Sequence, residues 1–218
     1  MRITLPSGTS AEIVRPSTGQ TTRGLVIAPD IFGLRPLFDE MVQRLADEWQ
    51  MVVCAVEPFP GRDLSPDIEP RFAAVPQIDD EVHLRDLLEA ADATECATVD
   101  LLGYCLGGMY CHKASRSDRF HRIVSFYGMI QVPDAWRSPT QGEPLTYLTS
   151  GHADRVLAIV GERDPYTPAP EVDALEATGV TVVRYPEAEH GFAHDVSRPA
   201  HRVEDAADAY RRTKAWLS

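Results

Sequence analysis

The sequence has no long apolar run, no surplus of basic residues and no closely paired cysteines. No stretch approaches the roughly 20 apolar residues of a membrane-spanning helix, and the first residues lack the apolar core of a signal peptide. The net charge of −12 repels phosphate backbones and anionic lipids, so we expect neither nucleic acid nor membrane as a partner. Together these absences predict a cytoplasmic protein.

The four cysteines have no spacing typical of a disulfide framework, so we expect free thiols in a reducing compartment. Hydrophobic residues make up 44% of the chain and charged residues 25%, as is ordinary for a globular protein. The 218 residues show no internal repeat and no linker-like segment. This organisation predicts one domain that spans residues 1–218.

Short apolar runs alternate with segments of helical periodicity along most of the chain. Residues 1–16 alternate loosely around a Ser7-Gly8 turn and predict a β-hairpin at a sheet edge. The runs that predict buried strands are 24–28, 51–56, 98–102, 123–126, 156–160 and 180–185, and the predicted helices are 37–49, 78–91, 106–115, 171–178 and about 200–217. This alternation predicts an α/β fold with a mostly parallel central sheet and helices on both faces.

Three segments between these elements predict loops. Residues 18–22 are polar, residues 57–76 hold five prolines, and residues 129–152 mix prolines with polar residues. Because a long loop inside a compact domain is more often functional than a linker, residues 57–76 are a candidate lid. The last helix has an apolar face that predicts packing on the sheet, and this face consists of Val203, Ala206, Ala207, Tyr210, Thr213, Trp216 and Leu217.

A glycine-rich segment near the middle of the chain carries the strongest functional signal. The strand predicted at 98–102 runs into Gly103-Tyr104-Cys105-Leu106-Gly107, and a predicted helix follows. This is the G-x-nucleophile-x-G pattern of a strand–turn–helix elbow, with Cys105 in the place of the usual serine. Backbone N–H groups and the helix dipole at such a helix N-terminus favour a thiolate. The alternative is a structural turn with a buried, inert cysteine.

Two further side chains follow later strands in an order that favours a catalytic triad. Asp164 follows the strand predicted at 156–160, and His190 lies in the loop beyond the last strand. Active groups of open α/β sheets gather at the carboxyl ends of strands, and α/β-hydrolase folds use the order nucleophile, acid, histidine. Taken singly, Asp164 could be a turn cap and His190 a solvated loop residue. Their joint order predicts a Cys105–His190–Asp164 triad.

These motifs resemble the dienelactone hydrolases. The resemblance rests on five segments between about residue 24 and the last helix: APDIFGL at 28–34, GYCLGG at 103–108, SFYG at 125–128, GERDPYTP at 161–168 and EHGF at 189–192. It implies an α/β-hydrolase fold without a large cap domain, a Cys–His–Asp triad and hydrolysis of an enol-lactone ester. The expected partner is a small ester or lactone, no cofactor is required, and the assembly is a monomer or small homo-oligomer.

The implied chemistry is acyl transfer through a thioester. His190 takes the proton of Cys105, and Asp164 orients the imidazole. The backbone N–H groups of Leu106 and, by the resemblance, Ile31 form the oxyanion hole. A thiolate leaves the tetrahedral intermediate more readily than an ordinary alkoxide does. The site therefore favours enol lactones, aryl esters and thioesters over alkyl esters.

The sequence departs from the family pattern at two positions that concern the thiol and the substrate. A family glutamate that holds the resting thiol corresponds to Asp30, which is one methylene shorter and could instead cap a helix. A family arginine that binds the substrate carboxylate corresponds to His194, a weaker and pH-dependent anion partner. A second such arginine corresponds to Arg71 or Arg62. Tyr127 in the SFYG segment is a further candidate for substrate binding or thiol positioning.

Other interpretations of the same residues stay open at this level. His190 and His194 lie four residues apart, but Gly191 and the loop context argue against a metal site. A broad carboxylesterase or thioesterase could use the same scaffold on esters that lack a second carboxylate. A hydrolase-like binding or redox-sensing protein could use Cys105 as an oxidisable thiol, although a binder has no need of the two other triad residues.

Overall fold

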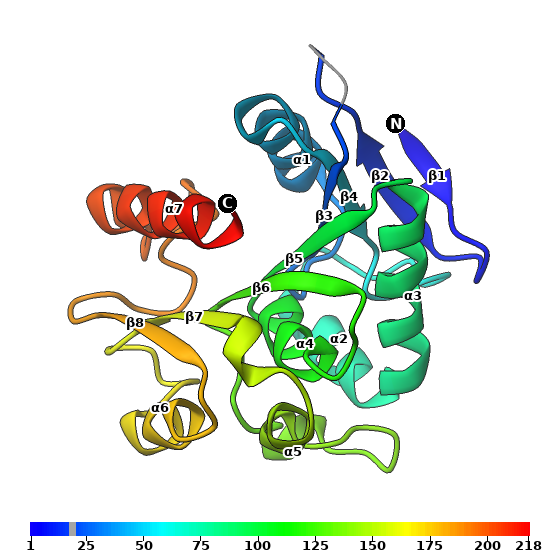
Figure 1. The fold of residues 1–218 in the computed structure, drawn as a ribbon. Coiled ribbons are helices and arrows are strands. Elements are labelled where there is room, and N and C mark those ends of the chain that lie inside the picture. Colours follow the sequence, from blue (N-terminus) through cyan, green and yellow to red (C-terminus); the bar gives the residue numbers. More distant parts are fainter. Residues whose placement is uncertain (18–20) are drawn as a thin grey trace.

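The computed structural model describes residues 1–17 and 21–218 and contains an eight-stranded sheet flanked by helices (Figure 1). The strand order is β1-β2-β4-β3-β5-β6-β7-β8. β1 (Arg2–Thr4) and β2 (Ser10–Val14) form the predicted antiparallel hairpin at the edge, and β2 also pairs antiparallel with β4 (Val52–Val56). The pairs from β4 to β8 are parallel, which confirms the mostly parallel sheet. The loop predicted at 18–22 lies partly outside the described residues.

The remaining strands are β3 (Arg23–Ala28), β5 (Thr98–Tyr104), β6 (Phe120–Phe126), β7 (Val156–Gly161) and β8 (Thr181–Tyr185). The central strands are mostly buried because helices cover both faces of the sheet, which explains their continuous apolar runs. All the predicted strands are present, although β6 begins at Phe120 rather than at residue 123.

The helices divide between the two faces of the sheet (Figure 1). α1 (Pro36–Trp49) and α7 (Val203–Leu217) pack on one face. The other face carries α2 (Ile68–Ala74), α3 (Asp80–Ala93), α4 (Leu106–Ala114), α5 (Pro144–Ser150) and α6 (Ala169–Glu176). No helix within residues 1–17 and 21–218 is long and apolar enough to cross a membrane.

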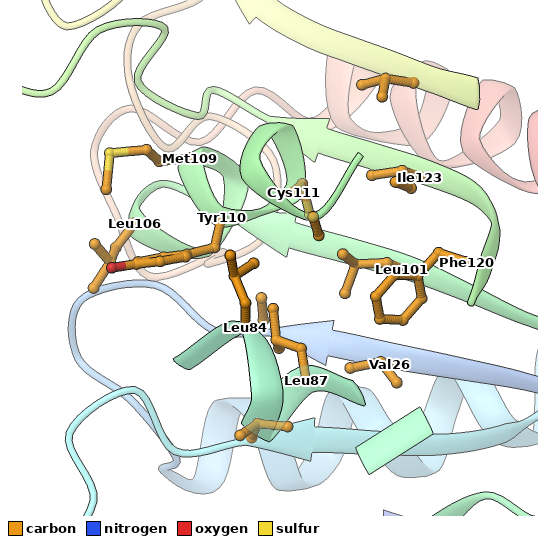
Figure 2. Packing of buried hydrophobic residues seen from close by; sticks show 14 of the residues in the cluster. Val26, Leu84, Leu87, Leu101, Leu106, Met109, Tyr110, Cys111, Phe120 and Ile123 are labelled. Carbon is orange, nitrogen blue, oxygen red and sulfur yellow. The ribbon is translucent and has the colours of Figure 1, made fainter. Parts of the chain in front are cut away.

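Alternation along β5 shows how one strand supplies two apolar cores. Leu101 lies in the core under α3 and α4, with Val26 of β3 and Leu87 of α3 (Figure 2). Leu102, its neighbour in the chain, lies in the core under α1 and α7. Successive strand side chains point to opposite faces, so an uninterrupted apolar run fills both cores.

Two segments that the sequence predicts as loops contain helices. Residues 57–76 include α2 and part of the 3-10 helix η1 (Val75–Gln77), and residues 129–152 include α5 and the 3-10 helix η2 (Asp134–Trp136). A third 3-10 helix, η3 (Ala153–Arg155), precedes β7. Pro70 and Pro144 lie in the first turns of α2 and α5, where a proline costs no intrahelical hydrogen bond. The loop prediction was therefore wrong where α2 and α5 form, because Pro70 and Pro144 lie in first helical turns, whereas residues 57–67 and 137–143 are in no helix or strand.

The apolar face predicted for the last helix is only partly buried. Val203 is 72% exposed, and Ala207 is exposed as well. Ala209, which the prediction omits, is fully buried. The helix starts at Val203, three residues after the predicted start, so this residue lies at the exposed end of the first turn. The buried face consists of Ala206, Ala209, Thr213 and Leu217.

Candidate active site

Cys105 lies between the end of β5 and the start of α4, at a sharp turn. Its backbone has φ 55° and ψ −114°, which non-glycine residues rarely adopt. The turn needs glycines on both sides of the cysteine. A Cβ on Gly103 would lie 2.3 Å from the carbonyl oxygen of Gly107, and a Cβ on Gly107 would lie 2.0 Å from that of Ala28. The N–H of Cys105 donates to the carbonyl of Phe126 at 3.0 Å, which fixes the strained residue against β6.

The structure brings Asp164 and His190 to Cys105. Asp164 is buried just beyond β7, and its Oδ2 accepts a hydrogen bond of 2.7 Å from Nδ1 of His190. The other carboxylate oxygen accepts a bond of 2.8 Å from the N–H of Tyr166, so the carboxyl group is held on both sides. His190 lines the same cavity as Cys105, and the two side chains interact electrostatically. Carboxylate, imidazole and thiol are thus brought together at one site.

The pKa of His190 depends on both of its neighbours. Burial lowers this pKa, but the interaction with the negative charge of Cys105 and the hydrogen bond to Asp164 outweigh burial and raise it from 6.5 to about 10. The imidazole is therefore protonated at neutral pH. A protonated imidazole beside a cysteine at a helix N-terminus favours a resting thiolate–imidazolium pair.

Leu106 and Ile31, the predicted oxyanion-hole residues, both have available backbone N–H groups. Leu106 is the first residue of α4, where an N–H has no intrahelical acceptor. The N–H of Ile31 donates to no other group in the part of the chain that the structure describes. Ile31 lines the same cavity as Cys105, and Leu106 follows Cys105 directly. Both groups can donate to a substrate oxygen beside the sulfur.

A cavity of about 240 Å³ lies beside Cys105 and His190. α2 and the stretch around η2 supply part of its wall, so both segments that were predicted as loops take part in the site. Its apolar lining is largely aromatic and consists of Ile31, Phe32, Ile68, Phe72, Met129, Trp136 and Tyr166. Such walls suit a flat, conjugated substrate.

Asp30 and His194 pair with each other. Nε2 of the buried His194 donates to Oδ2 of Asp30 at 2.8 Å. Arg35 adds two hydrogen bonds to Asp30, of 2.6 and 2.9 Å, and the N–H of Phe32 adds a third of 2.9 Å. Burial raises the pKa of Asp30, but His194 and Arg35 hold it well below its usual range. The carboxylate is therefore fully occupied by these partners, and it does not cap α1, whose N-cap is Arg35.

His194 and His190 point to different partners, although they are close in sequence. His194 is bonded to Asp30 and to the hydroxyl of Tyr127, whereas His190 is bonded to Asp164 and lies beside Cys105. Among the described residues, no group of three or more His, Cys, Asp or Glu side chains is arranged to hold a metal ion. Tyr127 is buried behind His190 and does not line the cavity.

The two arginines predicted for substrate binding lie elsewhere. Arg71 donates to three backbone carbonyls at 2.9 to 3.1 Å, one of which belongs to Ile31, so it braces the loops around the site. Arg62 lines a separate cavity next to the start of α3. Neither guanidinium lines the cavity beside Cys105.

Arg198, which the sequence analysis did not select, does line the cavity with Cys105 and His190. No carboxylate among residues 1–17 and 21–218 pairs with its guanidinium, which lies against Gly191. Its segment carries no recognisable motif, so no sequence signal could have identified it. The structure thus provides an unpaired cation in the cavity at a position other than the one predicted.

A mostly parallel sheet, a nucleophile elbow after β5, and an acid and a histidine after later strands define this protein as an α/β-hydrolase. The sequence model of the Dienelactone hydrolase family matches residues 10–218. The chain belongs to this family and is a carboxylic-ester hydrolase.

Named relatives agree with this assignment. A carboxymethylenebutenolidase of Rhodococcus opacus is 27% identical over 199 residues, which cover 87% of this chain and 78% of that protein. A carboxymethylenebutenolidase of Pseudomonas putida is 28% identical over 212 residues, with 89% and 84% covered. The crystal structure of a Klebsiella pneumoniae protein assigned to the dienelactone hydrolases superposes with a TM-score of 0.87 at 25% identity, and covers 100% of this chain and 97% of that one.

Proposed function

We propose that this protein hydrolyses an enol-lactone ester by acyl transfer through Cys105, His190 and Asp164. The observation that carries the proposal is the hydrogen bond from His190 to Asp164, with this histidine beside a cysteine in a strained elbow conformation. A cysteine that served only packing would need neither the strain nor a protonated histidine beside it. The relatives named carboxymethylenebutenolidase support the substrate class.

In the first half-reaction, the thiolate of Cys105 attacks the carbonyl carbon of the lactone. The carbonyl oxygen becomes an oxyanion, which the N–H groups of Leu106 and Ile31 stabilise. The ring C–O bond then breaks, and the leaving enolate takes a proton from the imidazolium of His190. The acyl group remains on Cys105 as a thioester.

In the second half-reaction, the neutral His190 takes a proton from a water molecule that attacks the thioester carbonyl. The thiolate of Cys105 leaves, and His190 is again an imidazolium. The product forms as a carboxylic acid and releases its remaining proton to solvent to become a carboxylate. Asp164 holds Nδ1 throughout, so that Nε2 serves the sulfur and the water in turn. One water is consumed for each ester bond broken, and none of these steps calls for a metal ion or an organic cofactor.

The cavity favours a conjugated substrate that carries a negative charge. Aromatic side chains supply flat apolar walls, and Arg198 is the cation that reaches the cavity without a carboxylate partner among the described residues. A guanidinium binds a carboxylate in a bidentate fork, which fixes the orientation of the ligand. We therefore assign to Arg198 the carboxylate-binding role that the resemblance had suggested for His194.

Turnover of the cis- and trans-dienelactones, followed by their ultraviolet absorbance, tests this function. Cys105→Ala should lose at least about a thousandfold in kcat, because the attacking atom is missing. An intact-mass measurement after mixing with p-nitrophenyl acetate should show an acetyl adduct on the wild-type protein but not on Cys105→Ala. A variant without the thiol that keeps a tenth or more of the wild-type turnover would contradict the mechanism.

A broad esterase or thioesterase activity is the second candidate, because most of the cavity wall is apolar and makes no demand for charge. This alternative predicts that uncharged aryl esters or acyl-CoA thioesters are cleaved with a higher kcat/KM than the charged lactones. It also predicts that Arg198→Gln leaves kcat/KM for the best substrate unchanged. The same substrate panel therefore separates the two functions.

A further inference from the structure

Tyr127 occupies a strained position behind the catalytic histidine. It follows β6 directly and has φ 40°, a left-handed backbone conformation that is unusual for a bulky residue. Its N–H donates to the carbonyl of Ile159 on β7 at 2.7 Å, and its side chain is fully buried. Such strain persists where the surrounding structure over-determines the conformation, and it is concentrated at functional sites.

The hydroxyl of Tyr127 begins a buried chain of hydrogen bonds. Asp30 only accepts hydrogen bonds, so Nε2 of His194 must carry the proton that it shares with Asp30 at 2.8 Å. Burial lowers the pKa of His194, so this histidine is neutral and its Nδ1 is an acceptor. Nδ1 accepts the hydrogen bond of the Tyr127 hydroxyl. The direction of each bond along Tyr127–His194–Asp30 is therefore defined.

This chain connects the segments that hold the two halves of the catalytic apparatus. Asp30 directly precedes Ile31, and Arg35 fixes its carboxylate with two hydrogen bonds. At the other end, the ring of Tyr127 meets the ring of His190 edge to face, with 5.2 Å between centroids. Asp30 and His194 are 164 residues apart in the chain, so their bond joins the loop after β3 to the loop after β8.

We propose that Tyr127, His194 and Asp30 are positioning residues. They hold His190 and the N–H of Ile31 in the relative positions that are needed around one substrate carbonyl. The inference rests on the proposed function and adds to it. Burying a network of polar groups costs free energy unless every group in it is hydrogen-bonded, and well-packed apolar side chains would stabilise this site equally well. The fully hydrogen-bonded chain therefore fixes the positions of His190 and Ile31. Its own residues do not contact the reacting atoms.

Tyr127→Phe removes one oxygen atom and keeps the ring against His190. We expect kcat for p-nitrophenyl acetate to fall about 10- to 100-fold with KM within about twofold, since a displacement near 1 Å can have this effect. Alkylation of Cys105 by iodoacetamide needs no oxyanion hole, and its rate should stay within about twofold of wild type. A matched control is Tyr147→Phe on α5, which also removes a hydroxyl that donates to a buried carboxylate, that of Asp80, at 3.1 Å.

A double-mutant cycle tests whether Tyr127, His194 and Asp30 act together as one relay or have independent structural effects. His194→Phe breaks both bonds of the histidine, so Tyr127→Phe should have little further effect on kcat in that background. Multiplicative losses in the double variant, or a Tyr127→Phe kcat equal to that of Tyr147→Phe, would overturn the relay while leaving the Cys105 mechanism intact. Turnover that survives Cys105→Ala contradicts the proposed function itself, and the relay is then refuted with it.

Discussion

Asp164→Asn tests whether the carboxylate sustains a thiolate–imidazolium pair in the resting enzyme. The neighbours of His190 raise its pKa from 6.5 to about 10. At ~1.4 kcal/mol for each tenfold change in proton affinity, this net rise corresponds to about 5 kcal/mol, so Cys105 and Asp164 together contribute more than this, because burial opposes them. An asparagine keeps the shape but removes the charge, and it offers one acceptor oxygen for two bonds, those from His190 and Tyr166.

The pH dependence of Cys105 alkylation by iodoacetamide measures this effect directly, because the thiolate is the reactive form. In the wild-type protein the rate should vary little between about pH 6 and pH 9, since the raised pKa keeps His190 protonated beside the sulfur. In Asp164→Asn the rate should rise with pH across this range. We also expect kcat to fall by about 10³- to 10⁴-fold, because the imidazole loses its orienting acceptor.

Asp134→Asn is a suitable control, since that carboxylate is 95% exposed and does not line the cavity. Its alkylation profile and kcat should match those of the wild type. A wild-type alkylation rate that rises about tenfold for each pH unit, as for a free thiol, would show that no ion pair exists in the resting site. Identical profiles for Asp164→Asn and the wild type would refute the role of Asp164.

Three further outcomes follow from the structure. Cys105→Ser should lower the preference for p-nitrophenyl acetate over ethyl acetate, because a serine alkoxide is expelled from the tetrahedral intermediate less readily than a thiolate. Equal preferences in both proteins would contradict this. Arg198→Gln should raise KM for a carboxylate-bearing lactone about 10- to 100-fold while leaving KM for p-nitrophenyl acetate unchanged, as expected for a lost charge-assisted pair. Burial lowers the pKa values of His83 and His112 to about 4, so the unfolded chain binds their protons more tightly, and the free energy of unfolding should fall as the pH drops from about 6.5 to 4. Urea titrations across that range check this, and His112→Gln should flatten the decline.

The order of elements, and the candidate triad residues that the fold brings together, could be predicted from the sequence because each leaves a local pattern. Buried strands are continuous apolar runs, and the glycines on both sides of Cys105 form a short sequence motif. Helices α2 and α5 escaped prediction because prolines in their first turns resemble loop prolines. The position of Arg198 in the cavity and the bond between Asp30 and His194 depend on loops that come together only in the folded chain. No sequence periodicity indicates such contacts.

The contacts of His194 differ from those expected of the family arginine that the resemblance had suggested there. A guanidinium has five donors and no acceptor, so an arginine could pair with Asp30 but could not accept the hydroxyl proton of Tyr127. The neutral imidazole donates through Nε2 and accepts through Nδ1, and this is what the two buried neighbours require. With Arg35 already neutralising Asp30, a second buried cation would also lack a counter-charge. Since we propose that Arg198, four residues further on, is the cation for the substrate, position 194 can hold the histidine of the proposed Tyr127–His194–Asp30 chain.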